Sequence, residues 1–200
     1  KGMGDTIGNS MRRTLLNSLP GAAITWVRID GVQHEYSSID GMSEGVIELL
    51  LNFKKIRLKA MSERSGRMRL DVKGEGQIVA GDIMTSADFE IVNPELYLAT
   101  IDKSSGKLSV EFNVEQGVGY IPSDRFAQEN LGIGFLPVDS IFSPVRKVNY
   151  EVEDLRIGNE TNLEKLTLEV WTDGSILPSD AVKNGADQLM KKFFQFVNLE

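Results

Sequence analysis

The chain has 200 residues, a net charge of −7 and no cysteine. Without cysteine it has no disulfide, no thiolate nucleophile, no cysteine-ligated zinc and no iron–sulfur cluster. Its net negative charge disfavours nucleic-acid binding as the main function, because basic side chains are needed to neutralise phosphates. The absence of cysteine fits a cytoplasmic protein, and 200 residues suit one domain or two small ones. A hydrophobic fraction of 41% is enough for a core, and without an apolar run of about 18 residues no membrane span is expected.

The first predicted element is an amphipathic helix. Asp5 is expected to be its N-cap, because a carboxylate accepts hydrogen bonds from the free N–H groups of the first turn. Ile7, Met11 and Leu15 recur every fourth residue and form one apolar stripe, and Pro20, followed by a glycine, ends the helix. The glycines at its start lack the spacing of a dinucleotide-binding motif. They are interpreted as positions where the helix lies close against a neighbour.

The middle of the chain has the alternating pattern of short β-strands. A second helix, predicted at 43–55, is apolar around much of its circumference and is expected to be buried between layers. Residues 107–116 are the clearest strand, and 117–134 are expected to form a loop. The expected strands are 22–29, 56–61, 67–73, 77–80, 95–101 and 107–116, with hairpins joining 56–61 to 67–73 and 95–101 to 107–116.

Two long strands and a helix are predicted for the C-terminal part. Val148, Tyr150 and Val152 alternate with polar residues, as do the residues of 166–171, so the two segments are expected to pair across a polar loop at 158–163. Pro178 suits the first turn of a helix that runs from about residue 179 to residue 197.

This last helix carries two adjacent apolar stripes, whereas a helix that covers one sheet needs only one. Burying each large side chain stabilises the protein by roughly 1.5–3 kcal/mol, so a second stripe left in water would forfeit several such contributions. The pattern favours burial against a second copy, and a helix enclosed within one large domain is the alternative. The first stripe consists of Val182, Ala186, Leu189, Phe193 and Phe196, and the second of Met190, Phe194 and Val197.

No catalytic constellation is evident in the sequence. His34 is the only histidine, so a site with several histidine ligands is impossible. A serine–histidine–aspartate triad could use Ser37 and Asp40, but the Gly-x-Ser-x-Gly elbow is missing. The sequence also lacks the tight Asp-x-Asp cluster of a Mg²⁺ site. It therefore indicates a non-catalytic chain without a cofactor, and a small hydrolase that uses His34 is the less favoured alternative.

A series of blocks, in order across nearly the whole chain, carries a family resemblance. The first, GMGDTIGNSMRRTLL at 2–16, has the pattern Gly-x-Gly-x-Thr-x-Gly-Asn-x-x-Arg-Arg-x-Leu-Leu. The others are IDGVQHEYS at 29–37, ELLLN at 48–52, GVGYIP at 117–122, PVDSIFSPV at 137–145, TNLEKL at 161–166 and WTDG at 171–174. Together they resemble the N-terminal assembly portion of the bacterial-type RNA polymerase alpha subunit.

The resemblance implies an α+β fold in two parts. A dimerisation domain, made of a small antiparallel sheet packed with two helices, would be built from both chain ends, 1–22 and 146–200, with a β-rich domain inserted at 23–145. The implied function is that of a non-catalytic scaffold of DNA-directed RNA polymerase, the nucleotidyltransferase of transcription. Two copies would pair and bind the beta and beta-prime subunits, without specific DNA binding by this segment. The alternative is a free-standing dimeric interaction domain outside the polymerase.

Individual residues match family positions. Arg13, Leu16, Lys73 and Val138 match positions implicated in contact with the beta subunit, and Arg156 matches one associated with beta-prime. An arginine on a helix surface suits this role, because its planar guanidinium engages carboxylates or carbonyls of a partner; the alternative is a surface salt bridge of little energetic value. The expected dimer contacts are Ile7, Met11, Leu15, Leu189, Phe193, Phe194, Phe196 and Val197.

Overall fold

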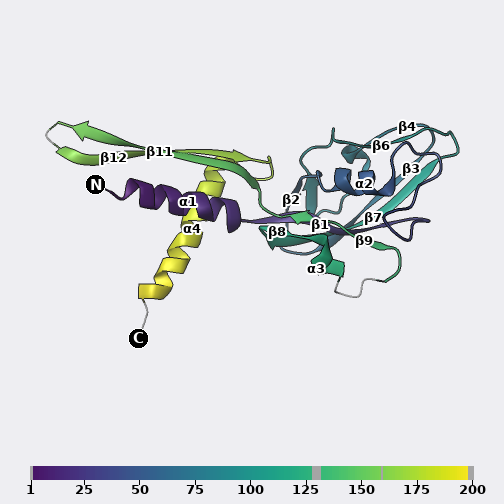
Figure 1. Cartoon of the computed structure of the whole chain (residues 1–200), viewed down its shortest axis with the longest axis horizontal. Helices are drawn as coiled ribbons and strands as arrows, with labels where there is room; N and C mark the ends of the chain where they lie inside the picture. Colours follow the sequence, from purple (N-terminus) through teal and green to yellow (C-terminus); the bar gives the residue numbers. More distant parts are fainter. Residues whose placement is uncertain (1, 128–131, 159, 198–200) are drawn as a thin grey trace. The chain divides into compact units, whose positions relative to one another are not determined.

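The computed structural model describes residues 2–127, 132–158 and 160–197 and has the predicted α+β fold, with helices and antiparallel strands (Figure 1). The chain divides into two compact units, and both ends of the chain contribute to one of them. Unit 1 consists of Lys1–Pro20 and Ser143–Glu200, and unit 2 of Gly21–Phe142. The division falls close to the predicted boundaries at 22 and 146, and a dimerisation role for unit 1 stays a prediction.

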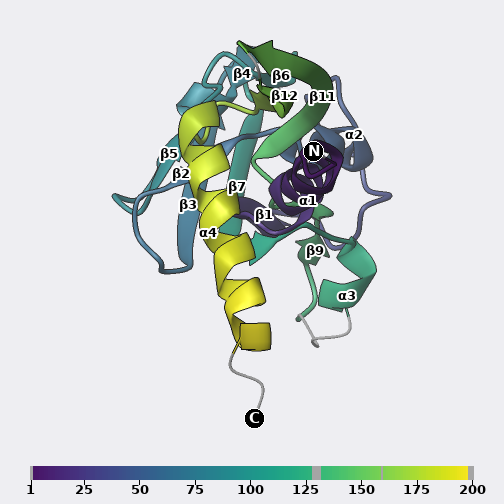
Figure 2. The same ribbon diagram turned by 90° about the vertical axis from the view of Figure 1, so that its left-hand side faces the viewer.

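Unit 1 combines two helices with a long hairpin (Figures 1 and 2). Strands β11 (Val145–Ile157) and β12 (Glu160–Thr172) are antiparallel, with Val148 opposite Val170, which confirms the predicted hairpin but shortens its loop. Helix α1 (Gly4–Asn17) packs on the hairpin and on helix α4 (Pro178–Val197). The core of unit 1 is formed by Met11, Leu15, Leu19, Val145, Val148 and Ala181.

Helix α1 lies close to the hairpin because two of its residues lack a side chain. A Cβ atom on Gly4 would lie 2.6 Å from Val152 Cγ1, and one on Gly8 would lie 2.5 Å from Tyr150 Cδ2. Both distances are far below van der Waals contact, so this approach requires glycine at both positions. The glycines therefore have the close-approach role predicted for them.

The prediction of Asp5 as the N-cap of α1 is wrong. The N-cap position is Met3, whose side chain forms no capping hydrogen bond, and Asp5 lies in the first turn. The N–H groups of Gly2 and Gly4 instead donate to the carboxylate of Glu164 in β12, at 2.5 and 2.8 Å. A carboxylate at this place also interacts favourably with the helix dipole. The start of α1 is thus capped from a strand more than 150 residues further along the chain.

Unit 2 is built from short strands, one helix of two turns and a shorter helix. Its main sheet has the order β3-β7-β1-β2-β5, with β9 also paired to β1, while β4 pairs with β6 and β8 with β10. The elements are β1 (Pro20–Ile29), α2 (Val46–Phe53), β2 (Leu58–Ala60), β3 (Gly66–Lys73), β4 (Gly76–Val79), the 3₁₀ turn η1 (Ala80–Asp82), β5 (Phe89–Ile91), β6 (Tyr97–Ile101), β7 (Lys107–Val118), β8 (Tyr120–Ile121), α3 (Ser123–Ala127), β9 (Phe135–Pro137) and β10 (Ser140–Ile141).

The core of unit 2 lies between α2 and the main sheet. The rings of Phe53 in α2 and Phe112 in β7 meet edge to face with centroids 4.9 Å apart, a favourable aromatic geometry. The alternation predicted for 107–116 is confirmed, because its four apolar residues are all buried: Leu108, Val110, Phe112 and Val114.

The expectations for helix α2 need correction. It covers only Val46–Phe53 rather than 43–55, and it begins after Gly45, whose N–H donates to Glu48 at 3.0 Å. Ile47 and Leu51 are exposed, so α2 buries one face rather than its whole circumference. None of the helices within the described ranges is long and apolar enough to cross a membrane.

Both hairpins predicted for the middle of the chain are wrong. Strand β6 pairs with β4 and strand β7 with β3, so the turn at 102–106 joins two different sheets. Strand β2 pairs with β1 and β5 instead of β3. Segment 117–134 holds β8 and α3 where a loop was expected, and its residues 128–131 lie outside the described part. Alternation predicts which residues of a strand face the core, but it contains no information about the neighbouring strand.

The substitution Gly8→Ala should lower the melting temperature. In a helix interior this change ordinarily stabilises by about 0.5–1 kcal/mol, but here the new methyl would lie 2.5 Å from Tyr150. We expect a net loss of about 1–3 kcal/mol, the usual cost of overpacking, in thermal unfolding followed by circular dichroism. Gly45→Ala is the control, because a Cβ there meets no atom within 4 Å. A raised melting temperature for Gly8→Ala would contradict the close packing of α1.

Candidate partner-binding surfaces

The last two turns of α4 expose a continuous apolar surface. The α4 patch, as it is called below, consists of residues that are 60–76% exposed: Met190, Phe193, Phe194, Phe196 and Val197. The part of α4 up to Leu189 is held by its own unit, where Val182, Ala186 and Leu189 pack against the core. The helix then continues past α1 (Figure 1). Exposed apolar patches of this kind mark interaction surfaces.

The predicted dimer residues lie in two different environments. Ile7 on α1 is exposed, as are the four predicted residues that belong to the α4 patch. Met11 and Leu15 are buried in the core of unit 1, and Leu189 is half-buried against it. These three side chains therefore point inward, and a contribution from them to pairing would be indirect, by holding α1 and α4 in place.

Arg13 and Leu16 are one turn apart on α1 and differ in exposure. Arg13 is exposed and forms no ion pair or side-chain hydrogen bond with any residue in the described part of the chain, whereas the neighbouring Arg12 donates to Asn9 Oδ1 at 2.9 Å. Leu16 is half-buried and packs against the core of unit 1. The guanidinium group of Arg13 is thus exposed and could bind a carboxylate or carbonyl group of a partner.

The other three predicted contact residues differ in their access to solvent. Lys73 is exposed at the end of β3. Arg156 is exposed near the end of β11, where its Nε donates to the carbonyl of Gly158 at 3.2 Å. Val138 is buried in the core of unit 2, so its side chain offers no surface to a partner.

The segment that contains Val138 is held by an ion pair that the sequence did not reveal. Lys54 Nζ lies 2.8 Å from Asp139 Oδ2, and 5.6 Å from the centroid of the Tyr120 ring. The second carboxylate oxygen of Asp139 accepts the N–H of Ser123 at 2.9 Å. One carboxylate therefore ties the end of α2 to the start of α3 and to the segment that follows β9.

These contacts lower the pKa of Asp139. Its hydrogen bond with Lys54 is the largest cause, followed by the hydrogen bond from the Ser123 backbone, and the pKa falls from 3.8 to about 2. Both partners stabilise the ionised form of the carboxyl group. The aspartate of the Pro-Val-Asp-Ser block is thus a structural anion, and the only hint of it in the sequence is a carboxylate directly after the apolar Val138.

His34 lies in an exposed loop of unit 2. Its Nδ1 is 3.1 Å from Ser37 Oγ, and no carboxylate in the described ranges hydrogen-bonds to its ring. Within the same ranges, no group of three or more His, Asp or Glu side chains is arranged to hold a metal ion.

Comparison with known proteins gives two kinds of match. Residues 27–143 match the family described as RNA polymerase Rpb3/RpoA insert domain. The chain is 50% identical to the DNA-directed RNA polymerase subunit alpha of Symbiobacterium thermophilum and to that of Desulforudis audaxviator, and 49% identical to that of Moorella thermoacetica. Each alignment covers 100% of this chain and 63% of the relative, so the chain spans less than two thirds of the length of these proteins.

The stability of unit 2 should fall as the pH drops through the range set by Asp139. Its pKa in the folded state, about 2, lies below the ordinary 3.8, so its contribution is present above about pH 4 and is lost between about pH 4 and pH 2. We expect the free energy of unfolding in urea to fall more steeply in this range for the wild type than for Asp139→Asn. Lys54→Met should also reduce the pH dependence of the free energy of unfolding, because it removes the cation that pairs with Asp139. The same pH dependence in all three proteins would contradict this role of Asp139.

Proposed function

Because this chain belongs to the family of bacterial RNA polymerase alpha subunits, we propose that it is the assembly portion of such a subunit. In this proposal it pairs with a second copy, and the dimer binds the beta and beta-prime subunits of DNA-directed RNA polymerase in the cytoplasm. The chain supports transcription by holding the large subunits in place, without an active site or a cofactor of its own. The observation that carries the proposal is the exposed α4 patch.

Covering two α4 patches against each other would contribute free energy of the same order as the cost of association. The five side chains of each patch are already partly buried, so covering the remainder in both copies contributes roughly 10–20 kcal/mol at the usual value for large apolar side chains. Association itself costs roughly 4–15 kcal/mol. A two-fold arrangement would place the same patch on both sides of the interface, and the exposed Ile7 of α1 would extend it.

The contacts with the large subunits would rely on exposed cations. Arg13, Lys73 and Arg156 are all exposed and can each engage a carboxylate or a carbonyl group of a partner. Val138 would act by holding the segment around Asp139, since its own side chain is buried. In the alternative function, a free-standing dimer outside the polymerase, these cations would have no such partner. Co-purification of the chain with the large subunits discriminates between the two functions.

The substitution Phe193→Asp should split the dimer. It places a charge in the α4 patch, where burial without a partner is costly. We expect sedimentation velocity to report the mass of a single 22.2 kDa chain for the variant and twice that mass for the wild type. Gln195→Asp is the matched control, because it adds the same charge on the opposite side of the helix and should leave the dimer intact. An unchanged sedimentation coefficient for Phe193→Asp would remove this residue from the interface.

The substitution Arg13→Ala should leave the dimer intact and weaken recruitment of the beta subunit. Arg13 has no partner in the described part of its own chain, so its loss should not disturb α1. In a pull-down with the beta subunit we expect retention to fall by about tenfold or more, the usual loss when one partner of a buried charge pair is removed. Lys183→Ala, which removes an exposed cation that pairs with Asp180 of its own helix, should bind like the wild type. Equal retention of both variants would refute the assignment of Arg13.

A further inference from the structure

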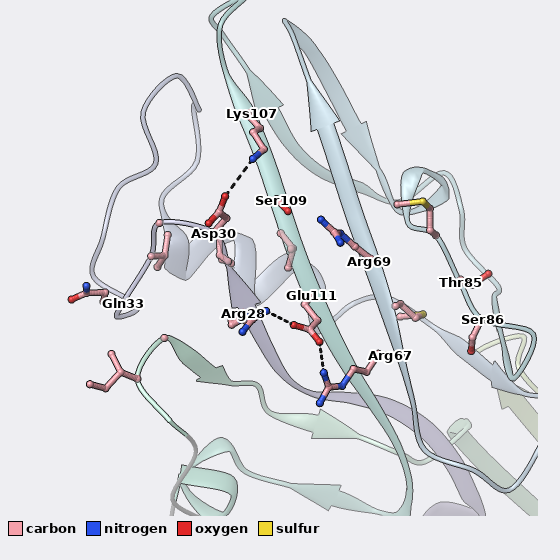
Figure 3. A pocket seen from close by; sticks show the side chains of 18 residues that line it. Arg28, Asp30, Gln33, Arg67, Arg69, Thr85, Ser86, Lys107, Ser109 and Glu111 are labelled. Carbon is pink, nitrogen blue, oxygen red and sulfur yellow. Dashed lines mark hydrogen bonds and ion pairs between the residues drawn. The ribbon is translucent and has the colours of Figure 1, made fainter.

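A groove crosses the face of the main sheet of unit 2 that points away from α2 (Figure 3). Its volume is about 980 Å³. The floor carries Arg28 of β1, Glu111 of β7 and Arg67 and Arg69 of β3, and the rims are formed by 84–86 and 133–134. None of these residues is among those assigned above to the dimer or to the large subunits. It is called the arginine groove below.

Around Glu111, the positive charges of the arginine groove are more exposed than the negative one. Glu111 binds Arg28 through one carboxylate oxygen at 2.8 Å and Arg67 through the other at 2.6 Å, so one carboxylate serves two guanidinium groups (Figure 3). The side chain of Glu111 is 21% exposed, whereas those of Arg28 and Arg67 are 55% and 66% exposed. A molecule that reaches Glu111 therefore meets guanidinium groups first, although the chain as a whole has a net charge of −7. Elsewhere in the lining, the carboxylate of Asp30 is 71% exposed and pairs with Lys107 at 3.3 Å.

Arg28 and Arg67 are held in place before any partner arrives. The guanidinium of Arg28 lies 5.7 Å from the centroid of the Phe135 ring, and that of Arg67 lies 5.6 Å from the Trp26 ring. The two rings themselves meet edge to face at 4.8 Å. A guanidinium has five N–H donors, so each arginine retains donors that Glu111 does not use. Because the side chains are already ordered, binding would cost little additional conformational entropy.

The surroundings of the arginine groove favour a protein partner over nucleic acid. The rims expose Ile133 and Met84, at 90% and 56%, and apolar side chains of a peptide would cover them. A phosphate backbone would leave them in water, and nucleic acid would also be repelled by the acidic chain. Trp26 is almost fully buried, so its ring is not free for stacking with bases.

We propose that the arginine groove is an additional interaction surface, which binds an extended acidic segment of a protein partner. A carboxylate of the segment accepts hydrogen bonds from Arg28 and Arg67, and its apolar residues cover Ile133 and Met84. This goes beyond a role in polymerase assembly, because it adds a binding function to the β-rich unit that needs neither the α4 patch nor Arg13.

The test measures binding of a fluorescently labelled peptide that alternates glutamate with leucine. Fluorescence anisotropy is recorded with the 200-residue chain at low ionic strength, with a peptide of glutamine and leucine as the neutral probe. We expect the double variant Arg28→Ala/Arg67→Ala to bind the acidic peptide at least about tenfold more weakly than the wild type. Arg146→Ala/Lys183→Ala is the matched control, because it removes two exposed charges from unit 1 and should bind like the wild type.

Three results would overturn the proposal. The first is that the alanine variant and the control variant bind the acidic peptide equally well. The second is that the wild type binds the neutral peptide as tightly as the acidic one. The third is that the wild type binds a single-stranded oligonucleotide more tightly than the acidic peptide. If the alanine variant has a lowered melting temperature, Arg28→Lys/Arg67→Lys replaces it. That variant keeps both charges but loses the planar guanidinium groups. If it binds the acidic peptide as tightly as the wild type does, the proposal is also overturned. Recruitment of the beta subunit should be unchanged in all groove variants, which separates this test from that of the assembly function.

Discussion

The contact between α1 and the β11–β12 hairpin is the constraint on which unit 1 depends. Gly4 and Gly8 allow the helix backbone to approach Val152 and Tyr150, and Glu164 caps the start of the helix from β12. The same face of α1 continues into the core through Met11 and Leu15. Because this face is used inside the unit, the opposite face with Arg13 is left for partners.

The core of unit 1 is small, and α4 extends beyond it. Its cluster of fully buried apolar residues contains six side chains, against a far larger set in unit 2, and small cores contribute little stability by themselves. Helix α4 crosses α1 at Gly185, where a Cβ would lie 3.0 Å from Leu15, and its side chains from Met190 to Val197 are exposed. A second copy would complete this core, so assembly and stability of unit 1 would depend on the same apolar surface.

The candidate surfaces could be predicted from sequence only where exposure follows from the pattern of one helix. The sequence placed Phe193 and Phe196 on one apolar stripe of α4 and Phe194 on the other, and the ends of both stripes are exposed. Arg13, expected on a helix surface, is exposed as well. Val138 was expected at an interface and is buried, because a family match contains no information on which way a side chain points. The Lys54–Asp139 pair joins residues distant in sequence and has no local signature. The shared carboxylate of the arginine groove likewise joins three separate strands.

The sequence by itself determined which side of β7 faces the core, the C-terminal hairpin and the two end helices, because these follow from apolar periodicity within single segments. The α+β class came from the resemblance of its sequence blocks to a known family. The tertiary structure alone decided which strands are neighbours, that Glu164 rather than Asp5 caps α1, and that α2 buries only one face. Each of these depends on contacts between segments far apart in the chain. Periodicity reports whether a face of a segment is apolar, whereas the partner of that face is selected by the packing of the whole unit.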